Sequence, residues 1–182
     1  SIASYNSNKN IFELLIVKLE GGELTTILFE NISEGDNLEI KGPLGKFILP
    51  ENIDRDLLLI CTGTGLAPFR SMLEYIYNNK IQHEKIFLIF GTRMKTDLLC
   101  YEQMNDFQKS ISDFHYIPVL SREKWEGEFG YVHKQYQSIV NKQTLNNPLF
   151  YLCGWRDMIS EARNNLKESG FDSKQIKLEI YN

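Results

Sequence analysis

The sequence predicts an α/β plus all-β fold, in which a small antiparallel segment precedes a doubly wound parallel five-stranded sheet. From Phe12 to Phe47, short apolar or alternating runs are separated by glycines, which is typical of antiparallel strands and turns. After Pro50 the pattern changes, and apolar runs alternate with amphipathic segments of helical length, as in βαβ units. We therefore expect two domains, residues 1–53 and residues 54–182.

The first domain is expected to contain short strands. The run Phe12–Leu19 is apolar and β-branched, and a glycine pair that begins at Gly21 ends it. Residues 37–41 alternate between polar and apolar side chains before Gly42 and Pro43 end that run. These features predict a small antiparallel sheet or part of a β-barrel.

The second domain is expected to alternate strands and helices. The predicted strands are Leu57–Cys61, Lys85–Phe90, Phe114–Leu120, Leu149–Cys153 and Gln175–Tyr181. The predicted helices lie near Ala67–Asn79, Leu98–Ile111, His133–Asn141 and Asp157–Ser169, and Gly170 is the expected C-terminal cap of the last. Because crossovers between parallel strands are right-handed, this alternation predicts a doubly wound sheet.

Composition disfavours several kinds of protein. The 182 residues are 42% hydrophobic, which is enough to build a core. A formal net charge of −4 and a pI near 5.5 disfavour a nucleic-acid partner, which would need a concentrated basic face. The apolar runs are far shorter than the ~20 residues that span a bilayer, so we expect no transmembrane segment.

The cysteines and histidines predict neither a metal site nor a disulfide framework. Cys61, Cys100 and Cys153 are widely separated, and the three histidines lack ligand spacing. Cysteines at this spacing cannot carry an iron–sulfur cluster, so any cluster would belong to a partner. Free thiols fit a reducing compartment, and we expect a cytoplasmic protein. The chain starts at Ser1 without Met, which leaves a preceding targeting leader open.

The most specific local signal is the glycine-rich turn after the first predicted parallel strand. Gly63 and Gly65 leave room for phosphates to approach the main chain. Pro68 suits the first turn of the following helix, where its missing N–H is not needed. The helix N-terminus offers free N–H groups and the positive end of a dipole, which together favour a pyrophosphate. Two glycines alone would fit an ordinary strand-to-helix turn equally well.

From Thr62 to Ser71, the sequence Thr-Gly-Thr-Gly-Leu-Ala-Pro-Phe-Arg-Ser resembles the nicotinamide pyrophosphate loop of the ferredoxin–NADP reductase superfamily. Pro68 stands where the Rossmann pattern has its third glycine. Further motifs of that family occur in family order at Ser1–Ser4, Gly22–Thr25, Gly35–Asp36, Gly42–Phe47, Phe90–Arg93, Ser121–Arg122, Tyr151–Gly154 and Leu178–Tyr181. The resemblance covers nearly the whole chain. It implies a partial antiparallel flavin-binding β-barrel followed by an NAD(P)-binding domain.

The resemblance implies FAD as one cofactor. The family's flavin motif would place Ser1 near flavin N5, and its Gly-x-x-Thr turn would receive the flavin pyrophosphate. The implied FAD-binding residues are Ser1, Ile2, Ala3, Ser4, Gly22, Leu24, Thr25, Thr26 and Tyr181. The Arg and Tyr of the flavin motif would precede Ser1, so we expect the family pattern to be N-terminally incomplete.

The resemblance implies NADP or NAD as the second cofactor. The implied NAD(P)-binding residues are Thr62, Gly63, Thr64, Gly65, Ala67, Pro68, Gly91, Thr92, Arg93, Ser121, Arg122, Tyr131, Cys153, Gly154, Asp157 and Met158. Similar reductases hold the 2′-phosphate of NADP with a Ser-Arg pair, and Arg122 can pair with phosphate bidentately. Tyr131 would stack on adenine. Glu128–Gly130 carries no lysine, and the Ser-Arg pair followed by Gly-Tyr-Val also resembles NADH-using oxygenase reductases. The sequence therefore favours NADP only slightly.

The implied catalytic residues are Ser1, Cys153, Glu179 and Tyr181. By resemblance, the Cys153 thiol faces the nicotinamide and positions its C4 against flavin N5. Tyr181 would stack on the isoalloxazine and be displaced when the nicotinamide enters, since its aromatic face matches the flavin. Alternation along the last strand puts Glu179 and Tyr181 on one side, with Glu179 beside Ser1. Trp155 and the residues after it open the next helix at the rim of the groove.

The resemblance implies a flavoprotein oxidoreductase that transfers hydride between NAD(P)H and FAD. Single electrons would then pass to a ferredoxin-like or flavodoxin-like acceptor, or to an oxygenase component. Two alternatives stay open. The chain could be a non-catalytic nucleotide-binding subunit of a larger electron-transfer complex, or a reductase that releases free reduced flavin.

Overall fold

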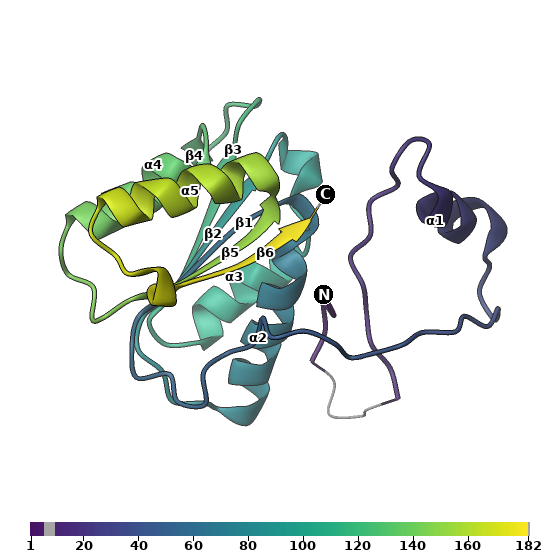
Figure 1. Ribbon diagram of the computed structural model, residues 1–182, viewed down its shortest axis with the longest axis horizontal. Coiled ribbons are helices and arrows are strands. Elements are labelled where there is room, and N and C mark those ends of the chain that lie inside the picture. Colours follow the sequence, from purple (N-terminus) through teal and green to yellow (C-terminus); the bar gives the residue numbers. More distant parts are fainter. Residues whose placement is uncertain (6–9, 182) are drawn as a thin grey trace.

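A parallel sheet of six strands, in the order β4-β3-β2-β1-β5-β6, organises most of the chain in the computed structural model, which describes residues 1–5 and 10–181 (Figure 1). The strands are β1 (Leu57–Thr62), β2 (Ile86–Thr92), β3 (Phe114–Leu120), β4 (Glu128–Phe129), β5 (Leu149–Trp155) and β6 (Ile176–Tyr181). The five predicted strands are confirmed. The chain builds outward from β1 to β4 on one side, then returns to place β5 and β6 on the other.

Helices cover both faces of the sheet, as predicted for a doubly wound fold. The helices α2 (Leu66–Asn79) and α3 (Tyr101–Ser110) pack on one face, and α4 (Val132–Asn141) and α5 (Arg156–Glu168) on the other. Short 3₁₀ turns occupy Gly63–Gly65, Lys95–Asp97 and Ser173–Gln175. Gly170, at φ 92°, follows α5 in the left-handed conformation expected of a C-terminal cap. Among the described residues, no helix has the length and apolar character needed to cross a lipid bilayer.

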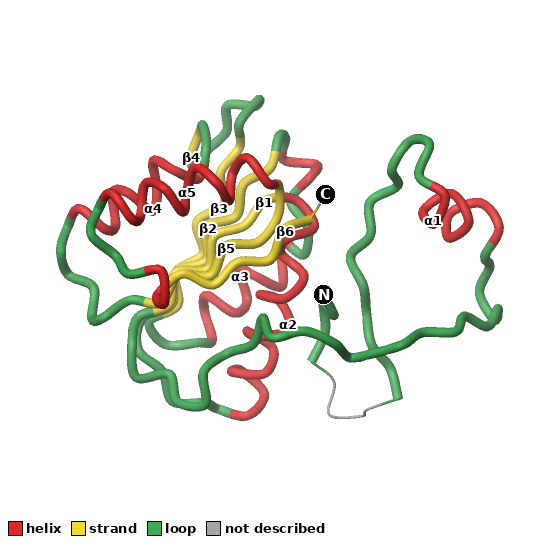
Figure 2. Tube along the Cα trace, in the orientation of Figure 1, coloured by secondary structure: helices red, strands yellow, loops and turns green. Residues whose placement is uncertain are grey.

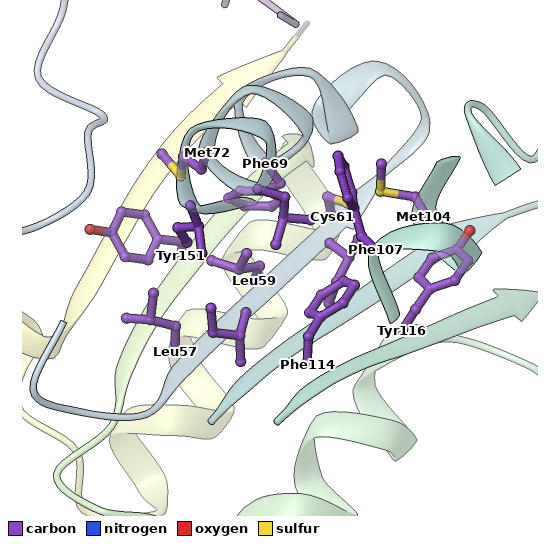
Figure 3. Packing of buried hydrophobic residues seen from close by; sticks show 14 of the residues in the cluster. Leu57, Leu59, Cys61, Phe69, Met72, Met104, Phe107, Phe114, Tyr116 and Tyr151 are labelled. Carbon is purple, nitrogen blue, oxygen red and sulfur yellow. The ribbon is translucent and has the colours of Figure 1, made fainter. Parts of the chain in front are cut away.

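Burial on both faces explains the uninterrupted apolar run of β1. Leu57, Leu59 and Cys61 point toward α2 and α3, where Phe69 of α2 covers them (Figure 3). Leu58 and the residues in step with it point toward α4 and α5. A strand buried on both sides gains nothing from polar alternation, so continuous hydrophobicity is the expected pattern for a central parallel strand.

The sheet and one helix differ from prediction in their detail. The sixth strand, β4, is a two-residue extension whose side chains are exposed, so no hydrophobic pattern marked it and it adds to the five strands predicted. Helix α3 begins at Tyr101 rather than Leu98, because Cys100 takes a left-handed φ of 52° and Leu98 is extended. The Asp97 carboxylate accepts from the Met94 N–H at 3.1 Å, which closes the preceding 3₁₀ turn.

The N-terminal segment differs most from prediction. Within residues 1–5 and 10–56 the structure contains the short helix α1 (Glu23–Thr26), a π-helical turn (Ile27–Asn31) and isolated bridges, but no strand ladder (Figure 2). The strands expected in Phe12–Leu19 and residues 37–41 are therefore absent from this segment. An extended run becomes a strand only when a neighbour satisfies its N–H and C=O groups. The apolar side chains of this segment, such as Val17 at 66% exposure, are left largely uncovered.

Phe47 attaches the end of this segment to the α/β domain. Its ring lies 5.3 Å from that of Tyr151 and 5.9 Å from that of Phe69, measured between ring centroids. The Tyr151 hydroxyl also donates to the Ile48 carbonyl at 2.8 Å. An aromatic cluster and a buried hydrogen bond therefore hold residues 47–48 against β5 and α2.

Arg70 on α2 attaches the beginning of the segment. Its guanidinium forms ion pairs with Glu13 and, at 3.2 Å, with Glu74, and its Nε donates to Gln103 of α3 at 2.7 Å. Glu74 in turn accepts from the backbone N–H of Tyr5 at 2.6 Å. Because the Arg70 side chain is only 14% exposed, this network is better shielded than an ordinary surface ion pair. It links the start of the chain to two helices.

Asp56 joins the three central strands at their amino ends. It is the buried charged residue of the described core, and its two carboxylate oxygens accept from the N–H groups of Lys85 at 3.1 Å and Asn146 at 2.7 Å. Its own carbonyl accepts from Leu149 at 2.8 Å. The residues that precede β1, β2 and β5 are thus held by one side chain.

Replacing Asp56 with Ala is expected to lower the free energy of unfolding by about 2–4 kcal/mol, because both backbone hydrogen bonds to its buried carboxylate are lost. Asp54→Ala is the matched control. Its carboxylate is 73% exposed, so the change should stay within about 0.5 kcal/mol. Urea unfolding of both variants measures the difference, and equal losses would contradict the role given to Asp56.

Candidate functional site

The sheet reverses its direction of growth between β1 and β5. The chain leaves β1 toward α2 on one face and leaves β5 toward α5 on the other, so the topology predicts a crevice between their carboxyl ends. In open parallel sheets, ligands bind at this switch point. The glycine-rich turn singled out in the sequence lies there.

The turn after β1 is compact. Gly63 takes a φ of 53°, in the left-handed region that favours glycine, and the 3₁₀ turn Gly63–Gly65 leads directly into the 14-residue helix α2. Ala67 and Pro68 lie buried in its first turn, as predicted. The free N–H groups and the positive dipole end of α2 therefore point to the crevice.

The turn and the end of β5 are in direct backbone contact. A Cβ on Gly65 would lie 2.4 Å from the Cys153 carbonyl oxygen. A Cβ on Gly154 would lie 2.4 Å from Thr62 Oγ1, and Gly154 also takes a φ of 128°. The Thr62 hydroxyl accepts from the N–H of Trp155 at 3.2 Å. Both glycines are required because two main chains meet where a side chain would otherwise stand.

The four predicted catalytic residues lie together at the end of β5 and β6. Cys153 is paired with Glu179 in the sheet register. The Ser1 hydroxyl donates to Glu179 Oε1 at 2.7 Å, and the Ser1 nitrogen donates to the Tyr181 hydroxyl at 2.8 Å. The Tyr181 side chain packs against the core cluster that contains Cys153. Residues 180 positions apart are thereby joined in one polar cluster.

Burial keeps the Cys153 thiol and the Tyr181 hydroxyl of this cluster protonated. It raises the pKa of the Cys153 thiol to about 12, helped by the charge of Glu179 and opposed by the Tyr181 hydroxyl. Burial likewise raises the pKa of Tyr181. At neutral pH the thiol is therefore protonated and can act through shape and polarity, but not as a thiolate nucleophile. Cys153 is fully buried, and Tyr181 is one of the groups that cover it.

The predicted flavin residues fall into two groups. Ser1–Ser4 runs beside β6, where Ala3 is buried and donates its N–H to the Glu13 carbonyl at 2.8 Å. Ser4 Oγ accepts from the N–H of Glu13 at 2.9 Å. Gly22, Leu24, Thr25 and Thr26 lie at α1, on the part of the N-terminal segment that stands away from the sheet (Figure 1).

The loops after β2 and β3 extend the crevice toward the other edge of the sheet. Ser121 donates to the Thr92 carbonyl through its N–H at 3.0 Å and its hydroxyl at 3.1 Å. The N–H of Arg122 donates to the Arg93 carbonyl at 2.9 Å. Both arginine side chains are exposed. Arg93 and Arg122 thus present two positive charges where hydrogen bonds join the loops after β2 and β3.

Tyr131 lies farther along the same edge. It is the residue before α4, and its side chain is 73% exposed. The following Val132 is buried against Gly91, where a Cβ would lie 2.7 Å from Val132 Cγ1. The close contact at Gly91 fixes α4 and leaves the Tyr131 ring facing solvent.

The first turn of α5 divides the remaining predicted residues. Asp157 is exposed at the crevice end of the helix, while Met158 is buried in the core between α4 and α5. Trp155, placed by the sequence only at the rim, proves to lie against the turn, with its Nε1 4.0 Å from a Cβ built on Gly63. The sequence feature that could have indicated this position is an aromatic residue directly after a Cys-Gly pair at the end of a strand.

The residues present fit a dinucleotide. The surface of the turn at Gly63 is open, since nothing nearer than the Trp155 indole faces a Cβ placed there. Free N–H groups, an exposed aromatic ring and two arginines follow one another along the carboxyl edge. For a flavin, the Ser1–Ser4 segment and the half-buried Tyr181 offer a polar and an aromatic surface side by side.

Family models match both parts of the chain. The oxidoreductase NAD-binding domain family matches residues 59–164, and the oxidoreductase FAD-binding domain family matches residues 1–48. These matches agree with the flavin and nicotinamide motifs expected from the sequence.

Curated relatives include an electron transfer component of a dioxygenase and a protein of a phenol hydroxylase. The chain is 32% identical to the phenol hydroxylase P5 protein of Acinetobacter pittii over 185 residues, which are 100% of this chain and 52% of that protein. It is 36% identical to the toluate 1,2-dioxygenase electron transfer component of Pseudomonas putida over 169 residues, which are 92% and 49% of the two chains. The chain spans about half the length of the curated relatives it matches.

Solved structures share the fold. The Amycolatopsis cytochrome P450 reductase GcoB superposes with a TM-score of 0.87 at 25% identity, covering 99% of this chain and 55% of that one. A ferredoxin NADP⁺ reductase from Neisseria gonorrhoeae with bound FAD and NADP superposes with a TM-score of 0.79 at 23% identity, covering 99% and 78%. The second likeness supports the fold alone.

Gly65→Ala is expected to lower the free energy of unfolding by about 2–3 kcal/mol or more, because the new Cβ would collide with the backbone of β5. Gly63→Ala is the contrasting variant. It introduces only the strain of a left-handed alanine, about 1–2 kcal/mol, because its Cβ has room. Denaturant unfolding compares the two, and a smaller loss for Gly65→Ala would contradict the backbone contact.

Proposed function

Because this chain belongs to the ferredoxin–NADP reductase superfamily, we propose that it transfers hydride between NAD(P)H and FAD and passes single electrons to a protein acceptor. One observation carries the proposal most directly. The glycine-rich turn and the cluster of Ser1, Cys153, Glu179 and Tyr181 meet at the switch point of the sheet. A dinucleotide seated on that turn would bring its nicotinamide to that cluster.

The proposed nicotinamide nucleotide lies across the carboxyl edge of β3, β2, β1 and β5. Its pyrophosphate would rest on the turn Thr62–Gly65 and on the first turn of α2, with Ala67 and Pro68. Gly91, Thr92 and Ser121 would shape the crevice floor, and Gly154 and Asp157 its other wall. Met158 supports that wall from within the core.

The adenosine end would extend toward Arg93, Arg122 and Tyr131. The exposed guanidinium of Arg122 suits a 2′-phosphate, and the exposed ring of Tyr131 suits adenine. This arrangement supports NADP slightly over NAD. Glu128 before Tyr131 introduces a negative charge, which keeps NAD a second candidate.

FAD, when bound, supplies the chemistry that converts two-electron transfer into single-electron transfer. Ser1 is proposed to orient the flavin through its hydroxyl, whose proton is already engaged by Glu179, so that its oxygen lone pairs face outward. Gly22, Leu24, Thr25 and Thr26 are proposed to hold the flavin pyrophosphate. Ile2, Ala3 and Ser4 provide the backbone that continues from Ser1.

Tyr181 is proposed to act as a movable cover. Its ring packs against the cluster that contains Cys153, and its hydroxyl accepts a hydrogen bond from the Ser1 nitrogen. Entry of a nicotinamide would require this ring to move aside and would expose the neutral thiol. Cys153 would then position the nicotinamide by contact, while Glu179 holds the Ser1 proton.

The proposed acceptor is a ferredoxin, a flavodoxin or an oxygenase component, and the names of two curated relatives, which refer to a hydroxylase and a dioxygenase, support the last of these. We place the flavin domain in residues 1–53 and the nicotinamide domain in residues 54–182. A cytoplasmic location is part of the proposal, because free thiols at Cys61, Cys100 and Cys153 suit a reducing compartment.

The separation between the two groups of predicted flavin-binding residues favours the alternative of a nucleotide-binding subunit. Because α1 stands away from the sheet that carries Tyr181, the chain could bind a nicotinamide nucleotide without retaining a flavin. It would then serve as a nucleotide-binding subunit of an electron-transfer complex. A reductase that releases free flavin would bind its flavin only transiently.

Visible absorbance and steady-state rates separate these functions. The proposal expects flavin absorbance bands in the purified protein and reduction of ferricyanide by NADH or NADPH, with the ratio of the two kcat/KM values giving the coenzyme preference. A colourless protein that still binds NAD(P)H would replace the proposal with the subunit alternative. Flavin that reconstitutes activity but is lost on gel filtration would favour a free-flavin reductase.

Tyr181→Ala is expected to tighten NADP⁺ or NAD⁺ binding by about 2- to 10-fold, because the nicotinamide no longer competes with the ring. It should also shift the flavin absorption bands. Tyr181→Phe keeps the ring and should leave both nearly unchanged. Equilibrium dialysis and absorption spectra of the two variants measure the effects, and unchanged affinity and spectrum in Tyr181→Ala would contradict the cover.

A further inference from the structure

Trp155 is an exposed aromatic residue that no contact within the described chain accounts for. Its side chain is 62% exposed, and among residues 1–5 and 10–181 its indole N–H has no acceptor and its ring no aromatic neighbour. The other tryptophan, Trp125, is different. Its indole donates to the Glu128 carbonyl at 2.8 Å, and its ring lies 6.4 Å from that of Tyr101 and 5.8 Å from the Lys95 ammonium.

The position of Trp155 is fixed by its backbone. Its N–H donates to Thr62 Oγ1 at 3.2 Å, and it is paired with Tyr181 in the register of β5 and β6. Paired residues of parallel strands point to the same face, so the register places both side chains on one side of the sheet, although their rings are not in contact. The indole Nε1 lies 4.0 Å from a Cβ built on Gly63. Trp155 thus stands between the glycine-rich turn and Tyr181.

The chemistry of the indole narrows what it can bind. Its N–H is a donor only, so the group that satisfies it must be an acceptor. It lies beside the free N–H groups of a helix N-terminus, and an anion attracted by those groups would meet the indole as well. Its broad apolar face is better suited to a sugar or a planar ring than to water.

We propose that Trp155 contacts the bound dinucleotide, with its indole N–H donating to a pyrophosphate oxygen and its ring covering the ribose on the nicotinamide side. This inference rests on the proposed function of the site. It assigns Trp155 to the middle of the dinucleotide, whereas Tyr131 lies at the adenine end. ADP-ribose should therefore reach Trp155, and AMP should not.

The sequence contains two tryptophans, which permits a direct test. Trp125→Phe leaves Trp155 as the only indole, and Trp155→Phe leaves Trp125. ADP-ribose and AMP are suitable probes because neither transfers hydride. In Trp125→Phe, saturating ADP-ribose is expected to lower the acrylamide quenching constant of the fluorescence at least about 2-fold, since the ring becomes covered. AMP should leave it unchanged, and neither probe should alter quenching in Trp155→Phe.

Calorimetry provides an independent readout. Trp155→Phe keeps a ring but loses the donor, so its affinity for ADP-ribose is expected to fall about 10-fold, as for a lost hydrogen bond to a charged oxygen. Its affinity for AMP should stay within about 2-fold. Trp125→Phe is the matched control, and it should bind both probes as the unaltered protein does.

The outcomes distinguish a failure of the inference about Trp155 from a failure of the proposed function. If ADP-ribose binds but neither quenching nor affinity depends on Trp155, the inference is overturned and the nucleotide site stands. Tighter binding by Trp155→Phe would also overturn it, because the ring would then obstruct the turn. If the unaltered protein binds neither ADP-ribose nor NAD⁺, the proposed function itself fails, and the inference fails with it.

Discussion

The turn after β1 and the last residues of β5 touch through their backbones, and this contact determines the geometry of the whole site. Gly65 lies against Cys153, and Gly154 lies against Thr62, each with no room for a Cβ. The contact draws together two strands that send their helices to opposite faces. It therefore sets how closely the carboxyl ends of β1 and β5 approach each other at the edge of the sheet. These four residues therefore fix the position of the surface on which the nucleotide is proposed to bind.

A second set of interactions ties the N-terminal segment to this geometry. Arg70 is four residues into α2, the helix that starts at the turn, and its pairing with Glu13 holds the strip of chain that carries Ser1. Glu74 holds Tyr5 of the same strip. At the opposite end of the sheet, the Asp56 carboxylate holds together the segments that lead into the central strands. The strip of chain that brings Ser1 to Tyr181 is thus held by Arg70 and Glu74, one and two helical turns after the start of α2.

The sequence predicted those features that depend on local pattern. Strands buried on both faces, such as Leu57–Thr62, are continuously apolar, and the glycines of the turn are visible because only they fit. The sequence could not predict β4, since two exposed residues carry no burial signal. Nor could it tell that Phe12–Leu19 lacks a neighbouring strand, because alternation describes one strand and pairing requires two. The Arg70 network could not be predicted either, because its members are distant in sequence and no local pattern connects them.

The order of the strands has a consequence for synthesis of the protein. β1 is made early, but its neighbour β5 emerges from the ribosome more than 80 residues later, and β6 is the last element of the described chain. Until then one edge of β1 is open, and its apolar face is incompletely covered. The backbone contact at Gly65 can form only after Cys153 has been added. The proposed binding site is consequently among the last parts of the domain to be assembled. Until then, the hydrophobic strand β1 of a nascent chain is exposed to non-native pairing.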